Sequence, residues 1–283
     1  MKLRQFTGHE GLHIAADTGG DPAAPPIVLL HGGGQTRHSW KNAARRLVTA
    51  GYRVIVPDLR GHGDTGWSPD GGYAITQYVE DLRALAATLA APPVLVGASW
   101  GGLTALVAAG GEVPVAARAV VLVDVTPRMN PDGVGRVLAF MGAHPDGFAS
   151  VEEAADAVAR YLPHRPRPRT TAGLAKNLRR RDDGRFYWHW DPRFLSGDAG
   201  GRVPDWPRLA ACAARLAMPV LLLRGTRSEL VDSEHVRELL AVVPHARYVQ
   251  ITDAHHMVAG DDNDNFAAAI LDFLAQDVFV ADS

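Results

Sequence analysis

Short apolar runs, each ending in a glycine-rich or polar turn, are the feature of this sequence that most limits its fold. They recur along the 283 residues at 26–34, 52–63, 93–102, 118–125, 219–225 and 247–256. Their apolar residues are consecutive rather than alternating with polar ones, which is typical of strands buried on both faces of a parallel sheet. Segments with helical periodicity, such as 76–90 and 233–243, lie between them. This β-α-β alternation predicts an α/β fold with a mostly parallel, doubly wound sheet.

Two parts of the chain stand outside this alternation. Residues 3–7 and 12–17 predict an antiparallel hairpin that leads into the sheet. Residues 126–217 lack a buried-strand run and are enriched in arginine, proline and aromatic residues, although sheet strands flank them on both sides. We therefore expect residues 1–125 and 218–283 to form the core, with 126–217 inserted as a mostly helical cap over one edge of the sheet.

Composition and charge exclude several classes of function. Hydrophobic residues make up 47% of the chain and charged residues 21%, which indicates a sizeable core rather than disorder. The formal net charge of −2 gives no electrostatic attraction for nucleic acid or for an anionic membrane. The single cysteine, Cys212, excludes an intramolecular disulfide and a cysteine-based metal site. Because no helical histidine spacing typical of zinc sites and no signal-like apolar segment is found, we expect a cytoplasmic protein without metal or cofactor.

A serine flanked by glycines follows one of the apolar runs, in the segment "VLVGASWGGLTA" at 94–105. The pattern is Gly97-x-Ser99-x-Gly101, with strand-forming residues before it and small helix formers after it. A nucleophile on a tight strand-to-helix turn needs small residues two positions away on either side, because the backbone there is strained and crowded. The pentapeptide alone fits a structural turn equally well, but its context favours Ser99 as a nucleophile.

A glycine loop after an earlier run fits the same chemistry. The run at 26–34 ends in His31 and three glycines. Acyl transfer creates an oxyanion, and each backbone N–H aimed at it raises the rate by on the order of 10²–10³. Gly33 can offer its N–H with no side chain in the way, and Trp100, directly after the serine, supplies a second one. We therefore expect an oxyanion hole from Gly33 and Trp100, with Gly34 in the adjoining substrate pocket.

The nucleophile also needs a base. A serine hydroxyl reacts poorly at neutral pH, so a histidine must accept its proton and an acidic group must orient that histidine. The last apolar run is followed by His255 and His256, ahead of an expected helix at 266–275. Adjacent residues cannot both face Ser99, so one of the two is expected to be the base.

In this order, the motifs "HGGG", "PDLRGHGDT", "VGASWGG" and the late histidine resemble the α/β-hydrolase fold family. The resemblance covers nearly the whole chain, with residues 126–217 in the position of the family's cap. The family usually has Gly-His before an apolar residue, so aligning on "HM" implies that His256 is the base. His255 then stands where the family prefers glycine, and we expect its imidazole in the substrate pocket.

The acid is the member of the triad at which this sequence departs from the family. The family commonly places an aspartate a few residues beyond the strand at 219–225, but the most usual position holds Ser228, which carries no negative charge. Glu229 follows, its longer side chain could compensate, and the chain order serine, Glu229, histidine fits. Asp124, at the end of another strand, is the position that some relatives use. We expect Glu229 to be the acid and keep Asp124 as the alternative.

The identity of the nucleophile also indicates which of the activities known on this fold are expected here. Serine at position 99 disfavours epoxide opening and halide displacement, which relatives perform with a carboxylate. We expect a cofactor-independent serine hydrolase that cleaves an apolar small-molecule carboxylic ester or lactone through an acyl-enzyme. Trp188 and Trp190 either line its pocket or pack within the cap. The alternatives are a carbon–carbon bond hydrolase, a haloperoxidase-like perhydrolase, a cofactor-free oxygenase and a binding protein without chemistry. The substrate and the oligomeric state stay open.

Overall fold

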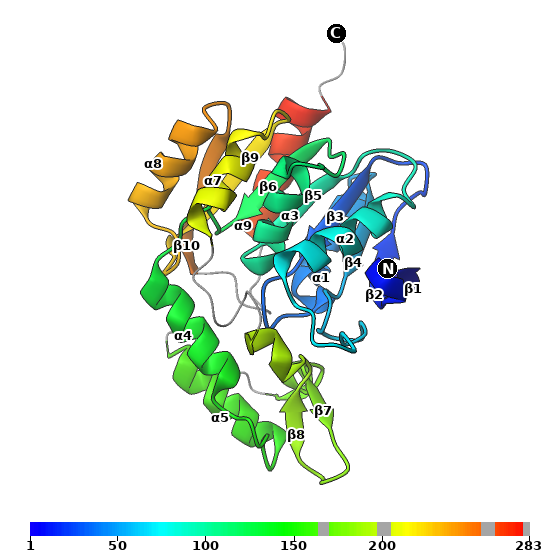
Figure 1. Cartoon of the computed structure of the whole chain (residues 1–283), viewed down its shortest axis with the longest axis vertical. Helices are drawn as coiled ribbons and strands as arrows, with labels where there is room; N and C mark the ends of the chain where they lie inside the picture. The colour runs from blue at the N-terminus through cyan, green and yellow to red at the C-terminus, as the bar shows by residue number, and fades with distance from the viewer. Residues whose placement is uncertain (164–169, 197–204, 256–263, 280–283) are drawn as a thin grey trace.

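An eight-stranded sheet forms the centre of the computed structural model, which describes residues 1–163, 170–196, 205–255 and 264–279. Its strands are β1 (Lys2–Thr7), β2 (His13–Gly19), β3 (Pro26–Leu30), β4 (Arg53–Pro57), β5 (Val94–Ala98), β6 (Ala119–Val123), β9 (Val220–Arg227) and β10 (Arg247–His255). They follow the order β1-β2-β4-β3-β5-β6-β9-β10 (Figure 1). The β1–β2 and β2–β4 pairs are antiparallel and the others are parallel. The predicted hairpin and the mostly parallel sheet are therefore confirmed.

The central strands are buried on both faces because successive side chains enter two different cores. On β3, Val28 and Leu30 belong to one core, whereas Ile27 and Leu29 belong to the other. Side chains of a strand point alternately to the two faces of the sheet, so a strand covered on both sides requires consecutive apolar residues. Every residue of β3, β5 and β6 is buried.

Helices cover both faces of the sheet (Figure 1). Residues of α2 (Ile75–Ala86), α3 (Trp100–Gly110), α7 (Trp206–Ala214) and α8 (Ser233–Val242) enter the core that contains Val28. Residues of α1 (Lys41–Thr49), α9 (Asp264–Phe273) and the π-helical turn η4 (Leu274–Val278) enter the core on the opposite face. Cys212 is buried in α7. The layers are thus helix, sheet and helix.

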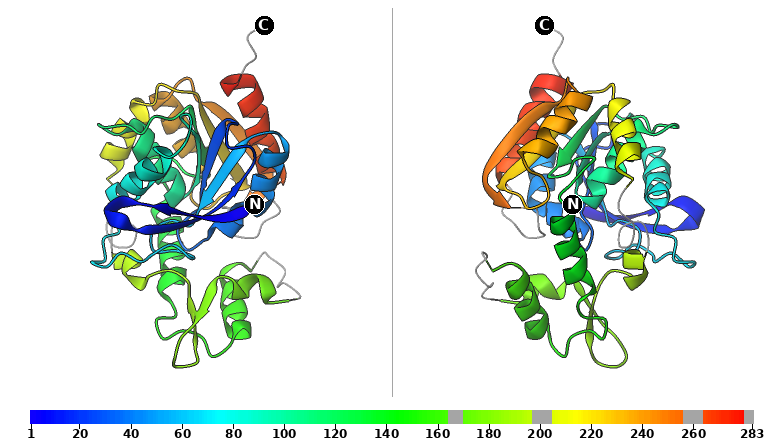
Figure 2. Two further views of the ribbon diagram at one scale, coloured as in Figure 1. Left: turned by 90° about the vertical axis from the view of Figure 1, so that its right-hand side faces the viewer. Right: turned by 60° about the vertical axis from the view of Figure 1, so that its left-hand side comes forward.

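The segment between β6 and β9 contains strands as well as the predicted helices. Its elements are α4 (Pro131–Gly142), α5 (Val151–Tyr161), the short helix α6 (Ala172–Ala175), the antiparallel pair β7 (Leu178–Arg180) and β8 (Phe186–Trp188), the 3-10 turn η3 (Pro192–Ser196), and α7. Figure 2 shows α4, α5, β7 and β8 at one end of the molecule, beyond the sheet. In contrast, α7 packs against α3 and covers the sheet. We keep the term "inserted segment" for residues 126–217.

Two further 3-10 turns complete the secondary structure of the described residues: η1 (His9–Gly11) in the β1–β2 connection and η2 (Arg37–Trp40) ahead of α1. In the part of the chain that the structure describes, no helix has the length and apolar character needed to cross a membrane.

Candidate active site

Ser99 lies at a strained turn between β5 and α3. Its backbone has φ 46° and ψ −117°, a left-handed conformation that is uncommon for a residue with a side chain. Between Pro93 and Gly110, every residue is buried except Ser99, which is partly exposed. The turn therefore lifts one hydroxyl out of an otherwise buried strand and helix, as the sequence predicts for a nucleophile.

The flanking glycines allow this turn because neighbouring backbone leaves no room for side chains. A Cβ added to Gly97 would lie 2.3 Å from the carbonyl oxygen of Gly101. A Cβ on Gly101 would lie 2.5 Å from the carbonyl oxygens of both Leu30 and His31. These distances are far inside van der Waals contact, so the turn requires glycine at both positions.

The glycine loop after β3 lies beside Ser99. A Cβ built on Gly32 would be 3.3 Å from the Cβ of Ser99. Gly33 and Gly34 are partly exposed, like the serine, whereas His31 and Gly32 are buried. Among the described residues, the Gly33 N–H has no hydrogen-bond acceptor. The N–H of Trp100 belongs to the first turn of α3, where no intrahelical acceptor exists.

Three buried histidines hold the glycine loop, and their hydrogen bonds fix which nitrogen carries the proton. We call His31, His62 and His189 the histidine cluster; the ring centroids are 5.3 Å apart for His31 and His62, and 5.8 Å for His62 and His189. The Leu59 N–H donates to His31 Nε2 over 2.9 Å, so His31 Nδ1–H donates to the Gly32 carbonyl over 2.8 Å. Both imidazole nitrogens of His31 are thus occupied.

The other two histidines hold the next glycine of the loop. The Gly34 N–H donates to His62 Nε2 over 3.0 Å, so His62 Nδ1–H donates to the Arg60 carbonyl over 2.9 Å. The Gly63 N–H donates to His189 Nδ1 over 2.8 Å, which leaves His189 Nε2–H to donate to the Gly34 carbonyl over 3.3 Å. Each imidazole acts once as donor and once as acceptor, which only the neutral form can do.

Burial keeps the histidine cluster uncharged. It lowers the pKa of His31 to about 4 and that of His62 to about 3. The pKa of His189 lies well below its usual range for the same reason, with the neighbouring imidazoles adding to the effect. The pKa values agree with the hydrogen bonds, because a protonated ring would lose the bond that it accepts from a backbone N–H.

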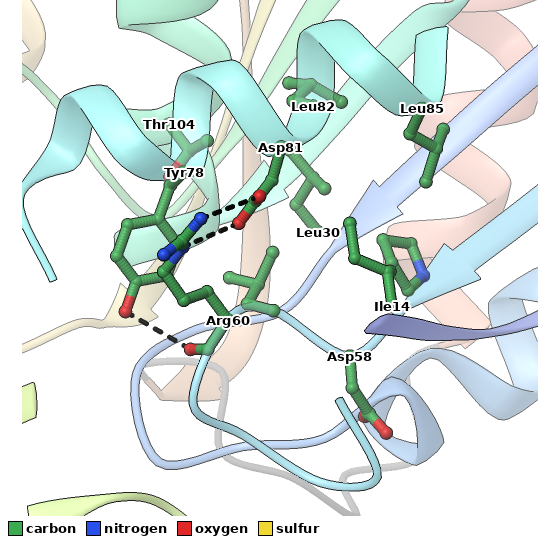
Figure 3. A pocket seen from close by; sticks show the side chains of 11 residues that line it. Ile14, Leu30, Asp58, Arg60, Tyr78, Asp81, Leu82, Leu85 and Thr104 are labelled. Carbon is green, nitrogen blue, oxygen red and sulfur yellow. Dashed lines mark hydrogen bonds and ion pairs between the residues drawn. The ribbon is translucent and has the colours of Figure 1, made fainter. Parts of the chain in front are cut away.

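A buried ion pair supports the loop that carries His62. The Arg60 guanidinium binds both carboxylate oxygens of Asp81 on α2 over 2.9 and 3.0 Å, beside a small cavity of about 20 Å³ (Figure 3). The Tyr78 hydroxyl donates to the Arg60 carbonyl, the same oxygen that accepts the bond from His62. The position of His62 therefore depends on contacts that reach back to α2.

Asp124 lies at the end of β6 and is fully buried, with φ 51°. The Ser228 hydroxyl donates to its carboxylate over 2.7 Å, and the Gly225 N–H approaches the other oxygen at 3.4 Å. Asp124 directly follows β6, and Ser99 directly follows the neighbouring strand β5. The alternative acid of the sequence analysis thus has a buried carboxylate that is held in place at the strand ends.

Glu229, the acid expected from the sequence, has different surroundings. Its carboxylate forms an ion pair with Arg136 of α4 over 3.0 Å, and both side chains are about 55% exposed. It lines a cleft of about 620 Å³ between α4 and α5. The Glu229 carboxylate is thus exposed and has its own cationic partner, whereas the Asp124 carboxylate is buried and hydrogen-bonded.

His255 is the last residue of β10, and His256 is the next residue in the sequence. His256 lies outside the described residues. His255 ends β10, where its backbone pairs with Arg227 of β9 after a register shift, and its side chain is outside the described part as well. Across the described residues, no three His, Cys, Asp or Glu side chains are grouped as metal ligands would be.

The predicted aromatic residues pack against other side chains. Trp188 and Trp190 are buried and stack on each other at 5.0 Å, within the inserted segment. The indole of Trp100 packs edge-on against Tyr78 and Phe194. Of the two interpretations of the tryptophans at 188 and 190, the structure therefore favours packing within the cap.

Two residues that the sequence analysis missed lie on the glycine loop. A Cβ on Gly33 would be 3.4 Å from the ring of Phe194, and one on Gly34 would be 3.1 Å from the Cε of Met141. Phe194 is in η3 and Met141 is in α4, so both come from the inserted segment. Their apolar character is the only signal in the sequence, and it does not separate them from core residues.

Comparisons with known proteins agree with this architecture. The family model described as alpha/beta hydrolase fold matches residues 25–262. Esterase Rv0045c from Mycobacterium tuberculosis is 32% identical over 84% of this chain and 79% of its own length. The 3-hydroxybutyrate-oligomer hydrolase from Cupriavidus necator is 31% identical, over 87% of this chain and 88% of its own. The crystal structure of E-2-(acetamidomethylene)succinate hydrolase shares the fold, with a TM-score of 0.84 and 23% identity, covering 96% of this chain and 98% of that chain. The chain therefore belongs to the α/β-hydrolase fold family and is an α/β-hydrolase enzyme.

Proposed function

We propose that this enzyme is a cofactor-independent serine hydrolase that cleaves a carboxylic ester or lactone through an acyl-enzyme. The observation that carries the proposal is the strained, partly exposed Ser99 beside the glycine loop. Strain of this kind persists only where the surroundings enforce it, and here they present a hydroxyl next to backbone N–H groups. The names of two relatives, an esterase and a 3-hydroxybutyrate-oligomer hydrolase, support the same reaction class.

In this proposal Ser99 Oγ attacks the carbonyl carbon while its proton passes to His256. The carbonyl oxygen becomes an oxyanion that accepts hydrogen bonds from the N–H groups of Gly33 and Trp100. His256 then gives its proton to the leaving alcohol oxygen as the ester bond breaks. A water molecule attacks the acyl-enzyme in the same way, and the carboxylic acid leaves with Ser99 restored.

We propose Asp124, rather than Glu229, as the acid that orients His256. The carboxylate of Asp124 is buried and accepts a hydrogen bond from Ser228, whereas Glu229 is exposed and paired with Arg136. Ser228 occupies the position after β9 where the family commonly places its acid. Its hydroxyl supports the neighbouring carboxylate from there, which explains how the triad could be complete without an acid at 228.

The substrate that we propose is a small apolar ester or lactone. Phe194 and Met141 lie against the glycine loop, so the surface beside the proposed oxyanion hole is apolar. Such a surface favours an uncharged acyl group over a charged one. The net charge of −2 gives no reason to add nucleic acid or an anionic membrane as a partner.

Covalent labelling tests the proposal most directly. Purified enzyme is treated with a fluorophosphonate probe, and the labelled peptide is identified by mass spectrometry. We expect one label on Ser99, together with turnover of p-nitrophenyl butyrate, and neither in Ser99→Ala. Folded wild-type protein that takes up no label and hydrolyses no ester in a screen of acyl-chain lengths and lactone sizes would contradict the proposal.

A further inference from the structure

We propose that His189, in the inserted segment, is a positioning residue for the oxyanion hole, so that the hole is correctly shaped only while this segment is seated on the core. This inference rests on the proposed function. His189 directly follows β8 and is 1% exposed. Its imidazole bridges two core loops, accepting from the Gly63 N–H and donating to the Gly34 carbonyl.

The direction of the Gly33 N–H depends on the hydrogen bonds made by neighbouring carbonyl groups of the glycine loop, because each peptide bond is planar. In a trans peptide the C=O and N–H groups point in opposite directions. The Gly32 carbonyl shares its peptide plane with the Gly33 N–H and accepts hydrogen bonds from His31 Nδ1 and the Gln35 N–H. The plane that carries the proposed oxyanion donor is thus fixed on its carbonyl side.

The next two peptide planes are fixed by the other members of the histidine cluster. The N–H of Gly34, in the Gly33–Gly34 plane, donates to His62. The carbonyl of Gly34, in the following plane, accepts from His189. Gly34 has φ +73°, so its backbone has few alternatives that keep both bonds. His189 is the member of the cluster that comes from outside the sheet-forming part of the chain.

Other contacts seat the segment that carries His189 on the same loops. Arg179 of β7 donates to the Asp64 carboxylate over 2.8 Å and to the Gly63 carbonyl over 3.1 Å. The Asp191 N–H donates to the Gly61 carbonyl, and its carboxylate accepts from the Tyr73 hydroxyl over 2.6 Å. Arg179 and Asp191 thus hold the segment on the loop at 61–64 and on Tyr73, whereas His189 hydrogen-bonds to the glycine loop itself.

A matched pair of substitutions separates the two hydrogen bonds of His189. Glutamine places an amide N–H near the position of Nε2, so His189→Gln can keep the bond to Gly34 and loses the bond from Gly63. Asparagine places its oxygen near the position of Nδ1, so His189→Asn can keep the bond from Gly63 and loses the one to Gly34. Asp191→Asn is the control, because it alters the contacts of a buried carboxylate with Tyr73 and Arg193 in the same segment but leaves both hydrogen bonds of His189 in place.

We expect His189→Asn to lower kcat for p-nitrophenyl butyrate by about tenfold, with KM changed less than about twofold, because a displaced donor weakens binding of the oxyanion only. The inhibition constant of an aliphatic trifluoromethyl ketone, whose serine adduct carries an oxyanion, is expected to rise by the same factor. His189→Gln and Asp191→Asn are expected to stay within about threefold of wild type in both quantities. Active-site concentration is measured with the fluorophosphonate probe, so loss of folded enzyme does not enter kcat.

Two results would overturn the inference in favour of a packing role for His189. One is an equal fall in kcat in His189→Asn and His189→Gln, and the other is a fall in kcat in Asp191→Asn as large as that in His189→Asn. If His189→Asn does not fold, wild-type enzyme provides a second measurement. The ¹⁵N resonance of His189 Nε2 is then expected to shift when the trifluoromethyl ketone binds, and an unchanged resonance would overturn the inference. A wild-type enzyme without labelling at Ser99 would instead reject the proposed function itself.

Discussion

The Ser228 hydroxyl donates a 2.7 Å hydrogen bond to the buried carboxylate of Asp124, across the ends of the neighbouring strands β9 and β6. Ser228 also accepts from the backbone N–H groups of Leu230 and Val231, which fixes the direction of its donated bond. Ser228 occupies the position where the family usually has its acid. It is therefore a hydrogen-bond partner of Asp124, the residue that we propose as the acid instead.

Substitution of the two candidate acids distinguishes them. We expect Asp124→Asn to lower kcat/KM for p-nitrophenyl butyrate by about 10³–10⁴-fold, because the proposed base would lose the carboxylate that sets its tautomer and orientation. Glu229→Gln is expected to stay within about threefold of wild type, since an exposed ion pair contributes little. Ser228→Ala removes one hydrogen bond to a charged group and is expected to cost about tenfold. A large loss in Glu229→Gln alone would reverse the assignment.

Ser99→Ala separates the proposed reaction from its rivals on the same fold. An acyl-enzyme mechanism cannot proceed without the hydroxyl, so we expect ester turnover to fall by at least about 10⁴-fold. A cofactor-free oxygenase depends on the base more than on the serine, so oxygen uptake that persists in this variant would favour that activity. Peracid formation from an ester and hydrogen peroxide by the wild type, at a rate above hydrolysis, would indicate a perhydrolase.

We expect that Gly101 cannot be replaced by alanine without loss of stability and activity. Gly135, where an added Cβ has free space, serves as the control. In Gly101→Ala the added Cβ would overlap the carbonyl oxygens of Leu30 and His31, so we expect a loss of stability of several kcal/mol and of activity. Gly135, in α4, has no atoms within 4 Å of an added Cβ. Gly135→Ala is expected to raise the free energy of unfolding by about 0.5–1 kcal/mol. Urea denaturation and ester turnover check both; a stable, active Gly101→Ala enzyme would contradict the close approach.

The histidine cluster predicts loss of stability in mild acid. Its folded-state pKa values lie below the value of about 6.5 in an unfolded chain, so the unfolded state binds more protons between about pH 4 and 6.5. Stability is therefore unaffected above pH 7 and falls as the pH drops through this window. Each of the three histidines contributes up to about 1.4 kcal/mol per pH unit. The charges that face them are Arg37 and Arg179, which lower their pKa values, and Asp58 and Asp191, which raise them.

Urea denaturation between pH 7.5 and 5 measures this dependence, because few carboxylates titrate there. The expected result is a free energy of unfolding that decreases steadily below pH 6.5. His189→Gln removes one titrating group and is expected to flatten the curve. A free energy that stays constant down to pH 5 would mean that the three imidazoles are not buried and neutral.

Much of the fold followed from local patterns, because a strand buried on both faces has to be continuously apolar. The runs at 26–34, 93–102 and 118–125 contain β3, β5 and β6 for that reason. The inserted segment was harder to predict. Leu178–Arg180 is a three-residue strand of mostly basic character, and it forms because it pairs with Phe186–Trp188 across a short turn. A strand with so few apolar residues gives no periodicity in the sequence.

Some residues of the candidate site could likewise be predicted from the sequence, and others could not. Gly97, Ser99 and Gly101 could be identified from the sequence because a strained turn dictates residue types at fixed spacing. Glu229 is expected from the sequence because it stands next to the family's usual acid position after the strand at 219–225, and position in the chain does not show which carboxylate is buried. The roles of His62 and His189 had no signal either, because both are defined by hydrogen bonds to a loop that lies far away in the chain.

The sequence by itself determined the order of the strands and helices of the core, the serine turn and the glycine loop, because these depend on neighbours within a few residues. Only the tertiary structure decided which carboxylate is buried beside the strand ends, that the tryptophans pack on each other, and that His189 reaches the glycine loop from the inserted segment. These relationships depend on desolvation and on contacts between residues that are distant in sequence, and both exist only after the chain has folded.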